Sequence, residues 1–171
     1  MSFSNLPEPF ALQYSFGSGY SYEIGGALWS STAPGTISAT ATGSSDVPAF
    51  NLGLNAPSPI AVTVPAVPET GTPTIPIGSD YTVTWLHGGE GTVEVYLQGY
   101  RDPNTTVGVS CVVQASVGQV TIPATMLALI APTGLAMVIT AQNVAEKQVQ
   151  DWNMQLVAQS RRWWHTVTYV P

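Results

Sequence analysis

Apolar and polar residues alternate along short runs over most of the chain, and turn-forming residues separate these runs. In Tyr81–Trp85, tyrosine, valine and tryptophan alternate with two threonines. Alternation with a period of two indicates a strand that buries one face. On this basis we predict strands over residues 20–28, 36–42, 50–54, 60–64, 81–85, 92–98, 107–114, 120–122, 135–141, 149–158 and 163–170.

The residues between these runs predict how the strands connect. The glycine-rich segment 87–91 lies between the strands 81–85 and 92–98, which predicts a hairpin with a glycine loop. Asp102-Pro103-Asn104 predicts a turn, because each of these residue types favours turn geometry.

A single helix is predicted near residues 123–130. Pro123 is suited to the first helical position, and the apolar run that follows it ends before Pro132 and Gly134. After it we expect only strands. Alternation in the last of them places Trp163, His165, Val167 and Tyr169 on one face and Trp164, Thr166, Thr168 and Val170 on the other.

Short strands at regular spacing predict an all-β fold, specifically an immunoglobulin-like two-sheet antiparallel sandwich with one short helix. Residues 1–19 are interpreted as an N-terminal leader or donor segment, and residues 20–171 as a single sandwich domain. Residues 65–78 contain four prolines and are interpreted as an extended crossover within that domain. A linker between two domains is the alternative for this segment.

Charge excludes several classes of partner. Charged residues make up 8% of the chain, and ten acidic against four basic residues give a net charge of −6. The only adjacent basic residues are Arg161 and Arg162, so we predict no binding to nucleic acid or to an anionic membrane surface. The sequence contains no run of about 20 apolar residues, so we predict no insertion into a membrane.

Cys111 is the only cysteine, which excludes an internal disulfide and a multi-cysteine metal site. Its place in the strand-like run Cys-Val-Val predicts a small buried apolar residue, with pairing to a partner's cysteine as the alternative. The N-terminus lacks a basic region followed by an apolar run, so we expect any export signal to have been removed.

The sequence offers little for catalysis. Only His87 and His165 are candidate bases, and no Gly-x-Ser-x-Gly motif accompanies either. Glu90 and Glu94 are better explained as the solvated edge of a hairpin than as a paired-carboxylate site. We therefore predict no enzymatic activity, no cofactor and no metal site.

Aromatic residues suggest a binding surface instead. Sugar-binding sandwiches stack apolar sugar faces on exposed aromatic rings. The candidate binding residues are Trp163, Trp164, Arg161, Arg162, Tyr100 and Trp152, with Tyr96 and His165 beside them. Alternation buries one face of each strand, so we also expect Trp85 and one member of the Trp163/Trp164 pair in the core. The outward member is then the anchor for a sugar.

Five segments carry a family likeness, which spans roughly residues 20–141: they are 43–50, 56–60, 80–85, 109–113 and 118–124. In this order they resemble uncharacterised extracellular immunoglobulin-like β-sandwich domains of myxobacteria and related soil bacteria. The resemblance implies export, commonly as a surface protein or lipoprotein, and no assigned reaction. It does not extend to residues 161–170.

Taken together, these patterns predict a non-enzymatic structural or interaction module of a secreted or cell-surface bacterial protein. Its partner would be another protein or other copies of itself, through a low-charge face or an exposed strand edge. Residues 5–10 are a candidate donor strand, with a disordered leader as the alternative. A carbohydrate-binding module that uses exposed tryptophan and tyrosine to bind polysaccharide is the alternative function.

Overall fold

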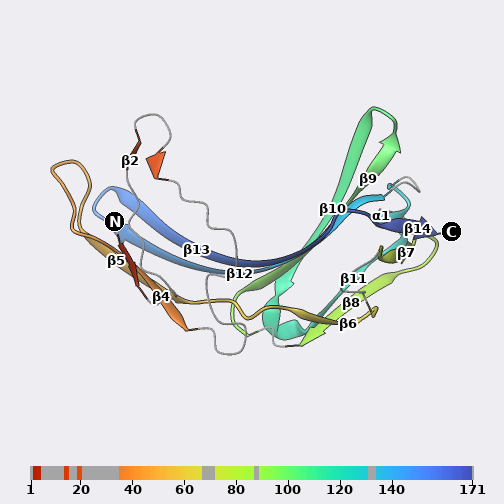
Figure 1. Cartoon of the computed structure of the whole chain (residues 1–171), viewed down its shortest axis with the longest axis horizontal. Coiled ribbons are helices and arrows are strands. Elements are labelled where there is room, and N and C mark those ends of the chain that lie inside the picture. The colour runs from red at the N-terminus through yellow and green to blue at the C-terminus, as the bar shows by residue number, and fades with distance from the viewer. Residues whose placement is uncertain are drawn as a thin grey trace. The chain divides into compact units, whose positions relative to one another are not determined.

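The computed structural model describes residues 2–4, 14–15, 19–20, 35–66, 72–86, 89–130 and 134–170. Strands dominate this part of the chain, and the predicted all-β class is confirmed (Figure 1). The strands are β1 (Ser2–Ser4), β2 (Tyr14–Ser15), β3 (Gly19–Tyr20), β4 (Thr36–Ala41), β5 (Phe50–Asn55), β6 (Ala61–Val64), β7 (Thr74–Pro76), β8 (Tyr81–Leu86), β9 (Thr92–Asp102), β10 (Thr105–Gln114), β11 (Gln119–Ile122), β12 (Gly134–Val149), β13 (Trp152–Trp164) and β14 (Thr168–Val170).

The chain folds into two compact units. Unit 1 consists of Met1–Ser58 and Asn143–Ala158, and unit 2 of Pro59–Gln142 and Gln159–Pro171. The proline-rich segment 65–78 falls within the range of unit 2, and the strands on either side of it, β6 and β7, both belong to that unit. The single-domain description of residues 20–171 stays a prediction.

Unit 2 is a sandwich of two antiparallel sheets (Figure 1). One sheet has the strand order β10-β9-β12-β13, in which residues 134–142 of β12 and 159–164 of β13 belong to unit 2, and the other has the order β11-β8-β6. The short strands β14 and β7 pair in parallel at residues 168–170 and 74–76. Such a sandwich buries the inner face of each sheet and leaves the outer face to solvent.

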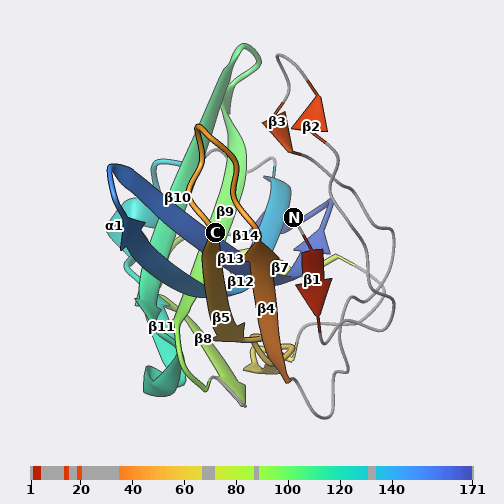
Figure 2. The same ribbon diagram turned by 90° about the vertical axis from the view of Figure 1, so that its left-hand side faces the viewer.

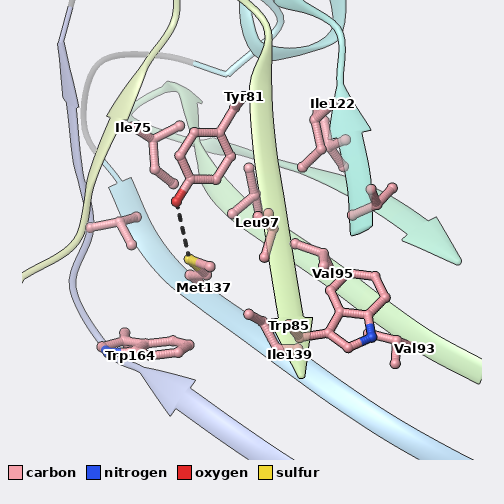
Figure 3. Packing of buried hydrophobic residues seen from close by; sticks show 14 of the residues in the cluster. Ile75, Tyr81, Trp85, Val93, Val95, Leu97, Ile122, Met137, Ile139 and Trp164 are labelled. Carbon is pink, nitrogen blue, oxygen red and sulfur yellow. Dashed lines mark hydrogen bonds between the residues drawn. The ribbon is translucent and has the colours of Figure 1, made fainter. Parts of the chain in front are cut away.

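The core of unit 2 lies between these sheets (Figure 3). Alternate residues of β8 and β9 point into it, and Val83, Val93, Val95 and Leu97 are fully buried. The indole Nε1 of Trp85 donates a 3.0 Å hydrogen bond to the carbonyl of Ala115, so the polar atom of this large ring is satisfied within the core. The predicted burial of Trp85 is confirmed.

The predicted hairpin between residues 81–85 and 92–98 is wrong. These residues form β8 and β9, which belong to different sheets of unit 2. Residues 89–91 therefore lie in a connection between sheets, and His87 and Gly88 lie outside the described residues. Alternation shows that each strand buries one face, but two strands that face each other across a core have the same pattern as two neighbours in one sheet.

The turn predicted at Asp102-Pro103-Asn104 is confirmed. It joins β9 to β10, the longest antiparallel pair of unit 2 for which the register is defined. The carboxylate of Asp102 accepts a 2.9 Å hydrogen bond from the backbone N–H of Asn104. This bond lowers the pKa of the Asp102 carboxyl, because it favours the charged form.

Two predicted strand boundaries near the C-terminus are wrong. The sequence predicts a strand over 149–158, yet β12 ends at Val149 and β13 begins at Trp152. The turn between them contains Gln150, which has a left-handed φ of 53°. Neither glycine nor proline marks this turn in the sequence, so the alternating pattern hides it.

The single strand predicted over 163–170 is interrupted as well. β13 ends at Trp164, the chain bends at His165, and β14 begins at Thr168. Trp164 and Val167 are both buried, although alternation would place them on opposite faces of one continuous strand. The bend allows both side chains to enter the same core.

Unit 1 contains the sheet β1-β4-β5, whose three strands lie side by side in Figure 2, and the small pair β2-β3. Its apolar cluster consists of Ile37, Leu54, Ala56 and Ala158, with Ala145 and Leu156 packed against it. The strand predicted over 36–42 is confirmed as β4. Most of the strand predicted over 20–28 lies outside the described residues, as does the donor segment 5–10.

The helix predicted near 123–130 is confirmed as the single turn α1 (Ala124–Leu127). Pro123 is its N-cap rather than its first helical residue. The carboxylate of Asp80 accepts a 2.9 Å hydrogen bond from the backbone N–H of Ala124, so a side chain distant in sequence satisfies one of the free N–H groups at this end. No helix of the described residues is long and apolar enough to cross a membrane.

Candidate interaction surface

The predicted binding residues are divided between the two units. Tyr100, Arg161, Arg162, Trp163 and Trp164 belong to unit 2. Trp152 belongs to unit 1, where it is the first residue of β13 and is 46% exposed. Tyr100 lies near the end of β9 and is 36% exposed.

Trp163 and Trp164 are neighbours in β13 with opposite environments. Trp164 is 4% exposed and belongs to the core of unit 2, whereas Trp163 is 54% exposed. This confirms that one member of the pair lies in the core. The guanidinium carbon of Arg162 lies 5.1 Å from the centre of the Trp164 ring, which is cation–π geometry. Trp164 is thus occupied by contacts within the chain and presents no free face for a ligand.

Trp163 has a stacked partner on the surface. Its ring centre lies 5.3 Å from that of His165, and the two ring planes differ by 18°. Both residues are exposed, and so is Arg161 on the same strand. The result is a small flat aromatic surface with a cation on the same strand, which suits the apolar face of a sugar ring or another planar group.

Glu94, one of the carboxylates considered for catalysis, is used in a contact within a sheet of unit 2. Glu94 accepts a 2.7 Å hydrogen bond from the hydroxyl of Ser110, a cross-strand pair between β9 and β10. Within the described ranges, no three His, Cys, Asp or Glu side chains are grouped so that they could hold a metal ion. His87, the other candidate base, lies outside these ranges.

A surface that the sequence did not reveal is the free edge of β10. This strand ends the sheet β10-β9-β12-β13, and only β9 pairs with it among the described residues. Its ten residues, Thr-Thr-Val-Gly-Val-Ser-Cys-Val-Val-Gln, contain no charged residue and no proline. A register shift between Thr105 and Thr106 marks an irregularity next to the turn, and the pairing with β9 is regular from Thr106 to Gln114. We call the outer backbone side of residues 106–114 the β10 edge.

The two faces of β10 differ in chemistry. Val109 is buried in the core of unit 2, and Cys111 and Val113 are partly buried against it. The opposite face carries exposed Thr106, Gly108, Ser110 and Val112. Strand alternation therefore continues to the very edge of the sheet.

Two details define the environment of this strand. The ring of Tyr96 on β9 covers Gly108: a Cβ atom built on Gly108 would lie 2.6 Å from the Tyr96 hydroxyl.

Cys111, predicted as a buried apolar residue, is only partly buried. Burial nevertheless raises the pKa of its thiol, so the unreactive thiol form is favoured.

Large apolar side chains are also exposed at other places in each unit. In unit 1, Val144 and Val157 are each 42% exposed on the hairpin formed by β12 and β13. In unit 2, Met126 and Leu129 are exposed at and just after α1. Single exposed apolar residues are common on soluble proteins, so these positions alone do not define a site.

No protein-family model, curated protein or solved structure matches this chain. The resemblance to extracellular domains of soil bacteria therefore stays a prediction.

Proposed function

We propose that this chain is a non-enzymatic structural or interaction module of a secreted or cell-surface bacterial protein, with an immunoglobulin-like sandwich that binds a protein partner or other copies of itself. The observation that supports it is the β10 edge. Natural β-proteins protect their sheet edges with charge, proline, bulges or short strands, because an open edge pairs with other strands. A ten-residue end strand without charge or proline is suited to contact with another strand.

The composition is compatible with this role. With 8% charged residues, the surface relies on hydroxyl and amide groups for its solubility. The net charge is only −6 over 171 residues, so the electrostatic repulsion between copies is weak at physiological salt, where the Debye length is about 8 Å. Backbone hydrogen bonds and apolar side chains would supply the attraction.

Light scattering coupled to size-exclusion chromatography tests the self-associating form of this proposal. The full chain would be measured from roughly 10 μM to 1 mM, a range suited to small interfaces. We expect the average mass to rise above that of the 18.0 kDa monomer as concentration increases. A constant monomer mass over the whole range would contradict self-association and leave a foreign protein as the only partner consistent with the proposal.

Carbohydrate binding is a second candidate function, and the stacked pair of Trp163 and His165 favours it. His165 stacks on one face of the Trp163 ring and restricts its orientation, while the tryptophan stays 54% exposed and offers its remaining flat surface to a sugar. Its test is a polysaccharide array probed with the wild type, Trp163→Ala and Trp152→Ala. Binding that is lost in Trp163→Ala and kept in Trp152→Ala would support a site at Trp163. Absence of binding by the wild type would exclude this function for the glycans tested.

A further inference from the structure

We propose that β10 pairs antiparallel with β10 of a second copy of this chain, so that the sheet β10-β9-β12-β13 continues from one copy into the next. This inference rests on the proposed function, because it names the partner and the strand through which a self-associating module would act. The contact would be made by residues Thr106–Gln114, where the pairing of β10 with β9 is regular.

The choice of β10 follows from the other strands at the ends of the two sheets of unit 2. β6 has four residues and is followed directly by Pro65, and β11 also has four residues. The part of β13 that belongs to unit 2 carries Arg161 and Arg162. Short length, proline and charge are the devices that prevent edge pairing, and β10 has none of them.

The choice of a second copy follows from the side-chain pattern of β10. A strand that joins this edge must place apolar residues toward the core and small or polar residues toward solvent, as β10 itself does. In an antiparallel pair of residues 106–114 related by a twofold axis at Ser110, Val109 lies opposite Cys111 and Val107 opposite Val113. Residues of one face thus meet residues of the same face, and the apolar row continues across the junction.

The charges near the junction determine how the association should respond to salt. Glu94 is hydrogen-bonded to Ser110 of β10, so each copy brings one carboxylate to the outer face beside the pair. Two carboxylates of like sign weaken the association, and salt screens this repulsion. We therefore expect a rise in NaCl concentration to leave the dimer unchanged or to strengthen it, whereas an association based on ion pairs would weaken.

The inward-facing Val107 offers a variant that acts on the edge. Val107 is partly exposed and lies on the same face as the buried Val109. In a monomer, a lysine at 107 can extend its ammonium group past the open edge into water. In the dimer the second strand covers this position and the charge would be trapped. Leu129→Lys is the matched control, since it makes the same charge change at a 58% exposed apolar residue of unit 2 outside β10.

Sedimentation velocity of the full chain over the same concentration range would compare the wild type with both variants. We expect a monomer–dimer equilibrium for the wild type and for Leu129→Lys, and at least a roughly tenfold higher dimer dissociation constant for Val107→Lys. Equal dimerisation of wild type and Val107→Lys would overturn the β10 inference while leaving a self-associating module in place. A wild type that stays monomeric would overturn both this inference and the self-associating form of the proposed function.

Amide hydrogen exchange of the wild type tests the same inference without any variant, so it applies even if Val107→Lys fails to fold. Alternate N–H groups of an edge strand point away from its single neighbour and exchange readily unless a second strand accepts them. Peptides that span residues 106–114 should exchange more slowly at the high end of the concentration range than at the low end, whereas peptides from β8 should show no difference. Exchange over 106–114 that is independent of concentration, in a sample that dimerises, would overturn the inference.

Discussion

The side-chain amide of Asn143 donates a 2.6 Å hydrogen bond to the backbone carbonyl of Asn55, which lies 88 residues earlier in the chain. Asn143 is one of only two polar residues buried in the described part of the chain. Asn55 is the last residue of β5, and its two chain neighbours, Leu54 and Ala56, belong to the apolar cluster of unit 1. The bond thus joins the two separate segments of sequence from which unit 1 is built.

We predict that Asn143→Ala destabilises the protein by about 1 kcal/mol, because the hydrogen bond to Asn55 is lost. The loss is limited because the substitution also removes the Asn143 Oδ1, a buried acceptor without a hydrogen-bond partner in the described part of the chain. Asn153→Ala is the control, since Asn153 is an exposed residue of the same unit, and its effect should stay within about 0.5 kcal/mol. Urea unfolding followed by circular dichroism would measure both. Equal effects of the two substitutions would show that the Asn143–Asn55 bond contributes little.

The two neighbouring tryptophans of β13 should respond differently to truncation. Trp164→Ala removes a ring from the core of unit 2 together with its contact to Arg162, and should cost about 3–5 kcal/mol. Trp163→Ala removes an exposed ring and should cost less than about 1 kcal/mol. Thermal unfolding would rank the two variants. A larger loss of stability for Trp163→Ala than for Trp164→Ala would mean that Trp163, and not Trp164, lies in the core.

Stability should fall in strongly alkaline solution because of Tyr81. Burial raises the pKa of this phenol to about 12, from 10.0 in the absence of any perturbation. The unfolded chain therefore loses the phenol proton at a lower pH than the folded chain, so the stabilisation is complete below pH 10.0 and is lost between pH 10.0 and about 12.

The test of this pH dependence is Tyr81→Phe, which keeps the ring and removes the hydroxyl that contacts the Met137 sulfur at 4.0 Å. Denaturant unfolding at several values between about pH 9 and about pH 12 would be compared for the variant and the wild type. The variant should lose less stability over this interval. Parallel curves for both proteins would assign the alkaline loss to other groups.

Two glycines of unit 1 provide a matched test of backbone geometry. Gly43 has a φ of 82°, and a Cβ at this position would lie 2.6 Å from the backbone nitrogen of Ala49. Gly43→Ala should therefore cost at least about 1–2 kcal/mol. Gly53 lies in β5, where an added Cβ would meet no atom closer than 3.5 Å, so Gly53→Ala should be nearly neutral. Equal melting temperatures for the two variants would contradict the left-handed turn at Gly43.

Much of the strand content could be predicted, since alternation records which face of a strand is buried. Residues 36–42, 81–85 and 107–114 are found in strands close to their predicted bounds. The burial of Trp85 and of one of the two adjacent tryptophans follows from the same rule. These predictions depend only on local periodicity and on the size of the core that a sandwich needs.

The connections between strands could not be predicted in the same way. Sheet membership depends on contacts between distant residues, so the glycine-rich segment after β8 has the pattern of a hairpin although it leads to the opposite sheet. The turn at Gln150 carries no glycine or proline, and the parallel pairing of β7 with β14 joins segments far apart in the chain. None of these features leaves a local pattern.

The candidate surfaces could be predicted only in part. The sequence predicts an exposed tryptophan at 163 or 164, but periodicity does not decide between them until the position of the core is known. The β10 edge has no sequence signature, because a strand in the middle of a sheet and an uncharged strand at its end can have the same pattern. What distinguishes them is the absence of a second neighbour among the described strands, which only strand order reveals.

The division of unit 1 into residues 1–58 and 143–158 also has a consequence for synthesis on the ribosome. Ala158 of the apolar cluster of unit 1 and Leu156, which packs against this cluster, are made only after residues 59–142, the longer of the two segments of unit 2. At translation rates of about 5–20 residues per second, the roughly 100 residues between Leu54 and Leu156 delay their arrival by roughly 5–20 s. During that interval Ile37 and Leu54 lack these partners, so a nascent chain halted before residue 143 should expose them to chaperones and proteases.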